Sequence, residues 1–229
     1  MNALDHTSRS ARLVRRAVAA AGLAGAALAA DATAAAAQAY SYPAFQPPTI
    51  VSREYTAAVA DAGRAGTSLI FQWREGMTSV SQFSFDAGLA DPDNGDARLL
   101  LGAGYGYQVN QAGANADFPL DVMLTAGAYG NFGDGNTVLR VPLGASIGRR
   151  ILLEGNFAIT PWVHPRASVN FCTECGGDGD GDVDVGLNFD LGADFELTQV
   201  LSIRAAVMFG GDEPDAFGLG LSWRPRGLR

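Results

Sequence analysis

Residues Val183 to Leu197 read VDVGLNFDLGADFEL, a stretch in which apolar residues alternate with polar or small ones. Val, Leu, Ala and Phe occupy the odd positions, whereas Asp, Gly, Asn and Glu occupy the even ones. A period of two predicts a β-strand, because successive side chains of a strand point to opposite faces. Ordinary strands have about 5 to 6 residues, and a tilted strand needs about 9 to 11 to cross a bilayer. The length of this stretch therefore predicts a strand that crosses a membrane.

The same alternation recurs along most of the chain after residue 52. It predicts nine further strands, separated by turns and loops rich in Gly, Pro, Asn and Asp. Their expected ranges are 53–61, 67–75, 80–90, 98–110, 120–132, 137–151, 157–171, 201–209 and 217–223. Pro161 and Pro165 lie on the apolar face of 157–171, where we expect a bulge or a bend, because proline gives no N–H to a ladder.

The two faces of these strands indicate the architecture. The polar faces are rich in Gly, Ser, Asn and Asp with isolated Arg, whereas the exposed face of a soluble barrel is rich in long charged residues. Aromatic residues on the apolar faces lie near strand ends, as in an interfacial girdle: Trp73, Tyr105, Tyr107, Phe195, Phe209, Phe217 and Trp223. The sequence predicts an all-β, antiparallel up-and-down transmembrane β-barrel of about ten strands, or eight if 53–61 and one other segment fail.

The connections between the strands differ in length. Residues 76–79, 111–119, 153–156 and 196–199 alternate with 91–96, 172–182 and 210–215. Outer-membrane barrels have short periplasmic turns and longer outer loops, so we expect the second set outside the cell, although 111–119 is long for a periplasmic turn.

The first 39 residues have the features of a secretory signal peptide. Arg9, Arg12, Arg15 and Arg16 precede the apolar run 17–30, and Ala37-Gln-Ala39 is a small-residue cleavage site. Cleavage after Ala30, or an Ala-rich surface helix, are the alternatives. Residues 40–52 are expected to be an extended linker, 53–224 the barrel and 225–229 a tail. Removal of residues 1–39 lowers the net charge from −8 to −10, which argues against a nucleic-acid partner.

The signal peptide, the repeated hairpins and the final Phe217-Gly-Leu-Gly-Leu-Ser-Trp223 resemble the small outer-membrane β-barrel proteins of Gram-negative bacteria, the broad class that includes OmpA, OmpX and OmpW. The resemblance covers roughly residues 50 to 225. It implies an outer-membrane location, outer-membrane lipid around the barrel, and the barrel assembly machinery as a partner. Members of this class usually end on an aromatic residue, whereas this chain continues from Arg224 to Arg229.

The inward faces of the predicted strands carry charges of both signs. The expected lumen residues are Arg74, Asp86, Asp121, Arg140, His164, Arg166, Asp184, Asp190, Asp194, Glu196 and Arg204. A barrel of this size is narrow enough for side chains to fill it, and an unpaired buried charge is costly. We therefore expect a network of ion pairs that plugs and stiffens the barrel. The alternative is a thin polar path for a small solute or ion.

The cysteine pair and the acidic loop that follows it are two further candidate sites. Cys172 and Cys175 are expected to form a local disulfide in an oxidising compartment, with a zinc or redox role as the alternative. Asp178, Asp180 and Asp182 form a loop that is either a weak calcium site or a solvated acidic loop. No cofactor is predicted.

No catalytic residue is predicted either. His164 and Ser168 lie about 13 Å apart along a strand, too far for a nucleophile and its base. The expected function is structural or passive transport of a small solute. The alternatives are a secreted soluble β-barrel that binds a hydrophobic ligand and an outer-membrane lipid-modifying enzyme.

Overall fold

The computed structural model describes residues 42–63, 66–93, 96–113, 118–133, 137–154, 157–173, 181–210 and 215–226, all of which belong to one compact unit within 36–229. No helix among these residues is long and apolar enough to cross a membrane. The predicted signal peptide lies outside the described residues, and its cleavage remains a prediction.

Eleven strands are formed within the described residues. They are β1 (Arg53–Asp61), β2 (Thr67–Gly76), β3 (Ser81–Asp91), β4 (Arg98–Asn110), β5 (Asp121–Phe132), β6 (Thr137–Gly148), β7 (Ile151–Leu152), β8 (Ala158–Thr173), β9 (Asp182–Glu196), β10 (Leu201–Phe209) and β11 (Ala216–Trp223). The stretch with the clearest alternation is β9, shifted by one residue from its predicted ends. The alternating pattern located the ten long strands, but the predicted strand 137–151 ends at Gly148 and the short β7 was not predicted.

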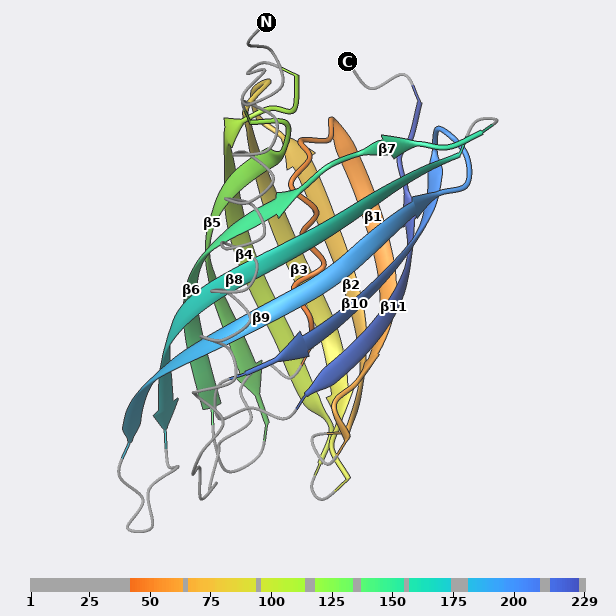
Figure 1. Ribbon diagram of the computed structural model, residues 1–229. Coiled ribbons are helices and arrows are strands. Elements are labelled where there is room, and N and C mark those ends of the chain that lie inside the picture. Colours follow the sequence, from red (N-terminus) through yellow and green to blue (C-terminus); the bar gives the residue numbers. More distant parts are fainter. Residues whose placement is uncertain are drawn as a thin grey trace, which may run out of the picture. The chain divides into compact units, whose positions relative to one another are not determined.

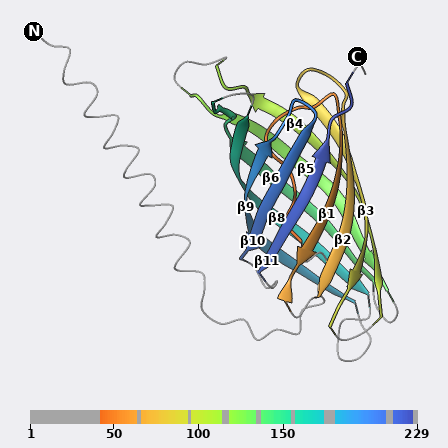
Figure 2. The same cartoon turned by 90° about the vertical axis from the view of Figure 1, so that its right-hand side faces the viewer.

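The strands close into a barrel (Figures 1 and 2). Each long strand pairs antiparallel with its neighbours in the chain, β6 pairs with β8, and β1 pairs with β11 to close the ring. The two-residue β7 extends the line of β6 and pairs only with β8. Ten long strands thus form the ring in the described part of the chain, which confirms the up-and-down barrel with about ten strands, and the alternative of eight is wrong.

The pairing of β6 with β8 is interrupted opposite both prolines of β8. Ladder pairs are missing between Gly144 and Ile147, opposite Pro165, and β6 ends at Gly148, opposite the residue after Pro161. The register is the same on both sides of these gaps, so the bulge expected here is not formed. The missing N–H groups of proline explain the gaps. The register does shift between β4 and β5, near Gln108 and Asn110, where nothing in the sequence predicted it.

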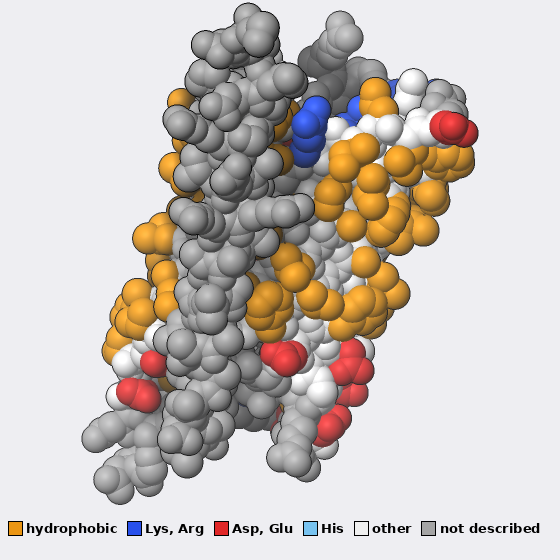
Figure 3. All heavy atoms as spheres, in the orientation of Figure 1, with side chains coloured by type: hydrophobic (Ala, Val, Ile, Leu, Met, Phe, Trp, Pro, Cys, Tyr) orange, Lys and Arg blue, Asp and Glu red, His pale blue; other side chains and the backbone are white. Residues whose placement is uncertain are grey.

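The outer face of the barrel is apolar. Large apolar side chains from every long strand are exposed, among them Leu69, Leu143 and Leu219, and the predicted aromatic residues lie on this face. Figure 3 shows the hydrophobic side chains as a band, with Lys or Arg above it and most of the acidic side chains below it, although an acidic side chain also lies at the upper right. Only lipid makes such an exterior stable in a monomeric barrel. The chain is a transmembrane barrel, and a soluble ligand-binding barrel has the opposite arrangement.

The two rims of the barrel are named here by their connections. The turn end carries the connections 77–80 and 197–200, the end of β11 and the start of β1. The loop end carries the connections 62–66, 92–97 and 174–181. Which rim faces the cell exterior remains a prediction, with the loop end outside.

Candidate functional site

Residues 42–52, called the plug segment below, run inside the barrel rather than away from it. They form neither helix nor strand, and in Figure 1 their orange trace passes between the walls. Tyr42 and Phe45 are each only 1% exposed. At the turn end the Gly76 N–H donates to Ser52 O, 3.0 Å away, and from there the segment leads into β1. This part of the predicted linker is therefore a component of the lumen.

The composition of the plug segment suits a lumen that is rich in donors. It has no charged side chain, and Pro43, Pro47 and Pro48 remove three N–H groups that would otherwise need acceptors. Four carbonyl groups of the segment accept hydrogen bonds from side chains of the wall. The bonds run from Arg204 Nη1 to Phe45 O (3.2 Å), Ser146 Oγ to Gln46 O (2.6 Å), Gln108 Nε2 to Pro48 O (3.3 Å) and Arg74 Nη2 to Thr49 O (2.7 Å). Within the segment the Gln46 N–H also donates to Ala44 O, at 2.6 Å, but most of the hydrogen bonds of the segment go to the wall, and these hold it in place.

Small inward residues make room for the plug segment. A Cβ atom added to Gly218 would lie 2.5 Å from Cζ of Phe45, and Ala60 lies beside the same glycine. Ala58, Ala60, Gly218 and Gly220 face one another across β1 and β11. The Phe45 ring packs over Gly218 and belongs to one buried cluster with Ala58 and Ala60. This run of small inward residues was the sequence signal for an occupied lumen, and it was missed.

A cluster of ion pairs surrounds Glu54 near the turn end. Glu54 Oε1 lies 3.1 Å from Arg74 Nη1 and 3.0 Å from Arg204 Nη2, and its Oε2 lies 2.7 Å from Arg224 Nε. Asp194 Oδ2 is 3.0 Å from Arg204 Nη2 and 2.8 Å from Arg224 Nη2. The side chains of Glu54, Arg74 and Arg204 are fully buried. Arg74 and Arg204 also hold the plug segment, so one network joins it to β1, β2, β9, β10 and the end of β11.

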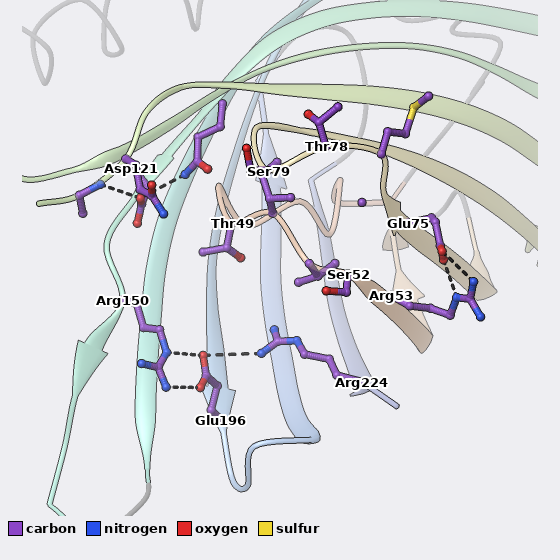
Figure 4. A pocket seen from close by; sticks show the side chains of 17 residues that line it. Thr49, Ser52, Arg53, Glu75, Thr78, Ser79, Asp121, Arg150, Glu196 and Arg224 are labelled. Carbon is purple, nitrogen blue, oxygen red and sulfur yellow. Dashed lines mark hydrogen bonds and ion pairs between the residues drawn. The ribbon is translucent and has the colours of Figure 1, made fainter. Parts of the chain in front are cut away.

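The turn-end mouth is an open vestibule of about 900 Å³, shown in Figure 4. Arg150 donates to both oxygens of Glu196, at 2.8 and 2.6 Å, and Arg224 Nη1 lies 3.6 Å from Glu196 Oε1. The hydrogen bond with Glu196 raises the pKa of Arg150 above its ordinary value. Thr49, Ile50 and Val51 of the plug segment are among the residues that line the vestibule. Sequence reasoning missed Arg150, which lies in the break between β6 and β7.

A second cluster surrounds Asp190 deeper in the lumen. Its Oδ2 lies 3.0 Å from Arg166 Nε and 3.2 Å from His164 Nδ1, and its Oδ1 accepts from the Ala44 N–H at 3.3 Å. His164 Nε2 is 2.8 Å from the Thr125 hydroxyl. Thr125, His164 and Asp190 thus have the order of a nucleophile, base and carboxylate. The cavity beside them measures only about 20 Å³, space for about one water molecule.

Four of the predicted lumen residues lie outside these two clusters. Asp86 accepts hydrogen bonds from Tyr42 and Gln72, and Asp121 accepts from Gln108 Nε2 at 3.2 Å. Arg140 donates to Asn170 at 2.8 Å. Asp184 is exposed near the loop end, where Asn170 Nδ2 donates to its Oδ2 at 3.5 Å. Its role in the lumen network remains a prediction.

Apolar side chains fill part of the lumen toward the loop end. Ile70, Leu100, Val138 and Met208 point inward and are 1 to 2% exposed. Leu100, Val138 and Met208 lie within three residues of the loop-end termini of β4, β6 and β10. The lumen is therefore more apolar near the loops than the sequence pattern predicted.

The loop-end candidates are described only in part. Cys172 is disulfide-bonded at the end of β8, but Cys175 lies outside the described residues, so their pairing remains a prediction. Asp178 and Asp180 also lie outside them. Asp182 begins β9 and is exposed. Within the described ranges, no three His, Cys, Asp or Glu side chains are grouped for a metal ion.

No family model and no curated protein matches the chain. Among solved structures it is similar to a bacterial polysaccharide outer membrane secretin, at 10% identity and a TM-score of 0.44, over 70% of this chain and 57% of that one. It is similar to the N-terminal β-barrel domain of Pseudomonas aeruginosa OprF, at 11% identity and 0.34, over 76% and 97%. It is also similar to the Acinetobacter baumannii outer membrane protein Omp33, at 9% identity and a TM-score of 0.37, over 76% of this chain and 98% of that one. In the described part of the chain, ten long antiparallel strands surround a polar lumen beneath an apolar exterior, which is the fold of a transmembrane β-barrel.

Proposed function

We propose that this protein is a closed outer-membrane barrel with a structural role, which holds its loop end at the cell surface and does not conduct solutes. The plug segment and the ion pairs around Glu54 fill the turn-end half of the lumen. Toward the loop end, Tyr42 and Phe45 of the plug segment form one buried cluster with inward apolar side chains such as Leu100 and Val138. The observation that carries the proposal is the burial of the plug segment within the lumen.

The contacts between the barrel wall and the plug segment favour the state in which the segment stays bound in the lumen over the state in which it is withdrawn. Its carbonyls meet buried guanidinium groups, and hydrogen bonds to charged groups contribute about 1.5 to 3 kcal/mol each. Withdrawal of the segment would leave Arg74 and Arg204 without these acceptors in a buried site. Such a loss is costly, so the closed state is favoured.

A passive path for a small solute is the second candidate. The vestibule of about 900 Å³ favours it, because it could admit a small polar molecule to the plug segment. Passage beyond that point would require the segment to move. A lipid-modifying activity has less support, because the cavity of about 20 Å³ beside Thr125 and His164 cannot hold a lipid.

Recordings in planar bilayers test the proposal. The mature chain should give no steady conductance, whereas deletion of residues 42–50 should open a path along the small residues of β1 and β11. The substitution Thr78→Gly in the exposed turn 77–80 leaves the plug segment intact, serves as a control for handling and should remain closed. Steady conductance of the mature chain at both polarities would favour the solute path and contradict the closed barrel.

A further inference from the structure

The vestibule at the turn end is lined by charges of both signs. It measures about 900 Å³ and is open to solvent, a size within the range of pockets that bind small molecules. Most of its charged side chains form ion pairs with one another, as Figure 4 shows. The chemistry that the vestibule offers to a ligand therefore depends on which members of these pairs remain accessible. The charged residues among its described lining are Arg53, Glu75, Asp121, Arg150, Glu196 and Arg224.

Two of the carboxylates are shielded from the vestibule. Asp121 is only 6% exposed, and its Oδ1 accepts hydrogen bonds from Gln108 Nε2 and from the Ala112 N–H, at 3.2 and 2.8 Å. The side chain of Glu196 is 10% exposed, and both of its oxygens accept from Arg150. These carboxylates therefore present little negative charge to a ligand.

The arginines remain more accessible than these two carboxylates. The Arg150 side chain is 45% exposed, and in the described ranges no group accepts a hydrogen bond from its Nη1. The Arg224 side chain is 21% exposed, and its Nη1 has only the approach of 3.6 Å to Glu196. Arg53 and Glu75 are almost equally exposed and pair with each other, so their charges offset one another. The accessible surface of the vestibule is therefore positive around Arg150, which favours an anion.

The uncharged lining restricts the class of anion. Ser52, Thr78, Ser79 and Gln111 also line the vestibule, and their hydroxyl and amide groups can both donate to and accept from the hydroxyl groups of a ligand. A hydrogen bond between a guanidinium group and a carboxylate is charge-assisted and strong. We propose that the vestibule binds a small organic anion with several hydroxyl groups, of the class of sugar acids, whose carboxylate accepts from Arg150 Nη1.

Titration of the mature chain in detergent micelles with sodium glucuronate tests the site. The measurement is made without lipid and at low ionic strength, where charges are weakly screened. The backbone amide signals of Gly76, Thr78 and Ala112, which line the vestibule, should shift until they saturate, with a Kd in the millimolar range. Glucose and glucosamine have the same ring without the carboxylate, so they should bind at least about tenfold more weakly.

Two neighbouring arginines provide a matched pair of variants. Arg150→Gln removes the free donor and should weaken the binding of glucuronate about tenfold or more. Arg149→Gln removes the same charge from an exposed residue that is not among the described lining of the vestibule. This variant should keep the affinity of the native chain.

Three results would each overturn the proposal. They are glucuronate shifts that do not saturate, equal affinities for glucuronate and glucosamine, and equal affinities of the two variants for glucuronate. The comparison of the sugars uses the unaltered protein, so it does not depend on how the variants fold. Failure of this site would leave the closed barrel intact, because that is tested by conductance.

Discussion

The substitution Glu54→Gln tests whether buried ion pairs stabilise this barrel. Glu54 is fully buried and lies within 3.1 Å of Arg74, Arg204 and Arg224. Glutamine keeps the shape of the side chain but removes the charge that these three guanidinium groups share. Removal of one partner from a buried ion pair costs about 3 to 5 kcal/mol, because the other charge stays buried without compensation.

The expected loss lies at the lower end of that range. Arg204 keeps Asp194 at 3.0 Å, and Arg74 keeps the carbonyl of Thr49 at 2.7 Å. We therefore expect a loss of about 3 kcal/mol in the free energy of unfolding. In urea this corresponds to a lower midpoint by on the order of 1 M. Unfolding from detergent micelles or vesicles, followed by tryptophan fluorescence, measures this midpoint.

The matched control is Glu75→Gln. Glu75 pairs with Arg53 at the rim, where both side chains are about 30% exposed, and exposed ion pairs contribute little to stability. This variant should leave the midpoint unchanged. In an Arg74→Met background, Glu54→Gln should cost less than in the native chain, because the two residues are coupled. Equal midpoints for Glu54→Gln and Glu75→Gln would refute the reasoning.

Three further predictions concern the plug segment, the lipid face and the loop end. Gly218→Val should displace the Phe45 ring and lower the free energy of unfolding by about 1 to 3 kcal/mol, measured in urea, whereas Gly186→Ala should have little effect, because its added Cβ would meet no atom closer than 3.6 Å. Leu219→Arg on the lipid face should cost about 2 to 4 kcal/mol, measured by folding into vesicles, and Asp215→Arg at the loop end should cost far less. A peptide map under non-reducing conditions should link Cys172 to Cys175, and free thiols at both positions would contradict the predicted disulfide.

The strands could be predicted from the sequence because the lipid and the lumen demand different side chains at alternate positions. Along β9, Leu187, Phe189 and Leu191 face outward while Asn188 and Asp190 are buried, as the alternation of Val183 to Leu197 indicated. The same alternation predicted that most of the charged residues of the strands point inward. The alternation tells which side chains point inward but not which of them meet across the lumen. The convergence of three Arg residues on Glu54 could therefore not be predicted.

The plug segment could not be recognised from its own residues. Tyr42 to Ser52 has no periodicity, and its position depends on space that distant strands provide. Gly218 and Ala60 belong to opposite ends of the barrel sequence and become neighbours only when β11 pairs with β1. The same limit applies to the vestibule, whose lining includes Thr49 of the plug segment and Arg150. Long-range closure of the barrel, rather than local propensity, creates both sites.

The contact between Phe45 and Gly218 tests the occupied lumen most directly. A nuclear Overhauser measurement on the mature, isotope-labelled chain in micelles would detect it, since a Cβ on Gly218 would lie only 2.5 Å from the Phe45 ring. We expect cross-peaks between the ring protons of Phe45 and the α-protons of Gly218, with dispersed signals for the whole plug segment. Narrow random-coil signals for Phe45, without cross-peaks to β1 or β11, would contradict a lumen closed by this segment.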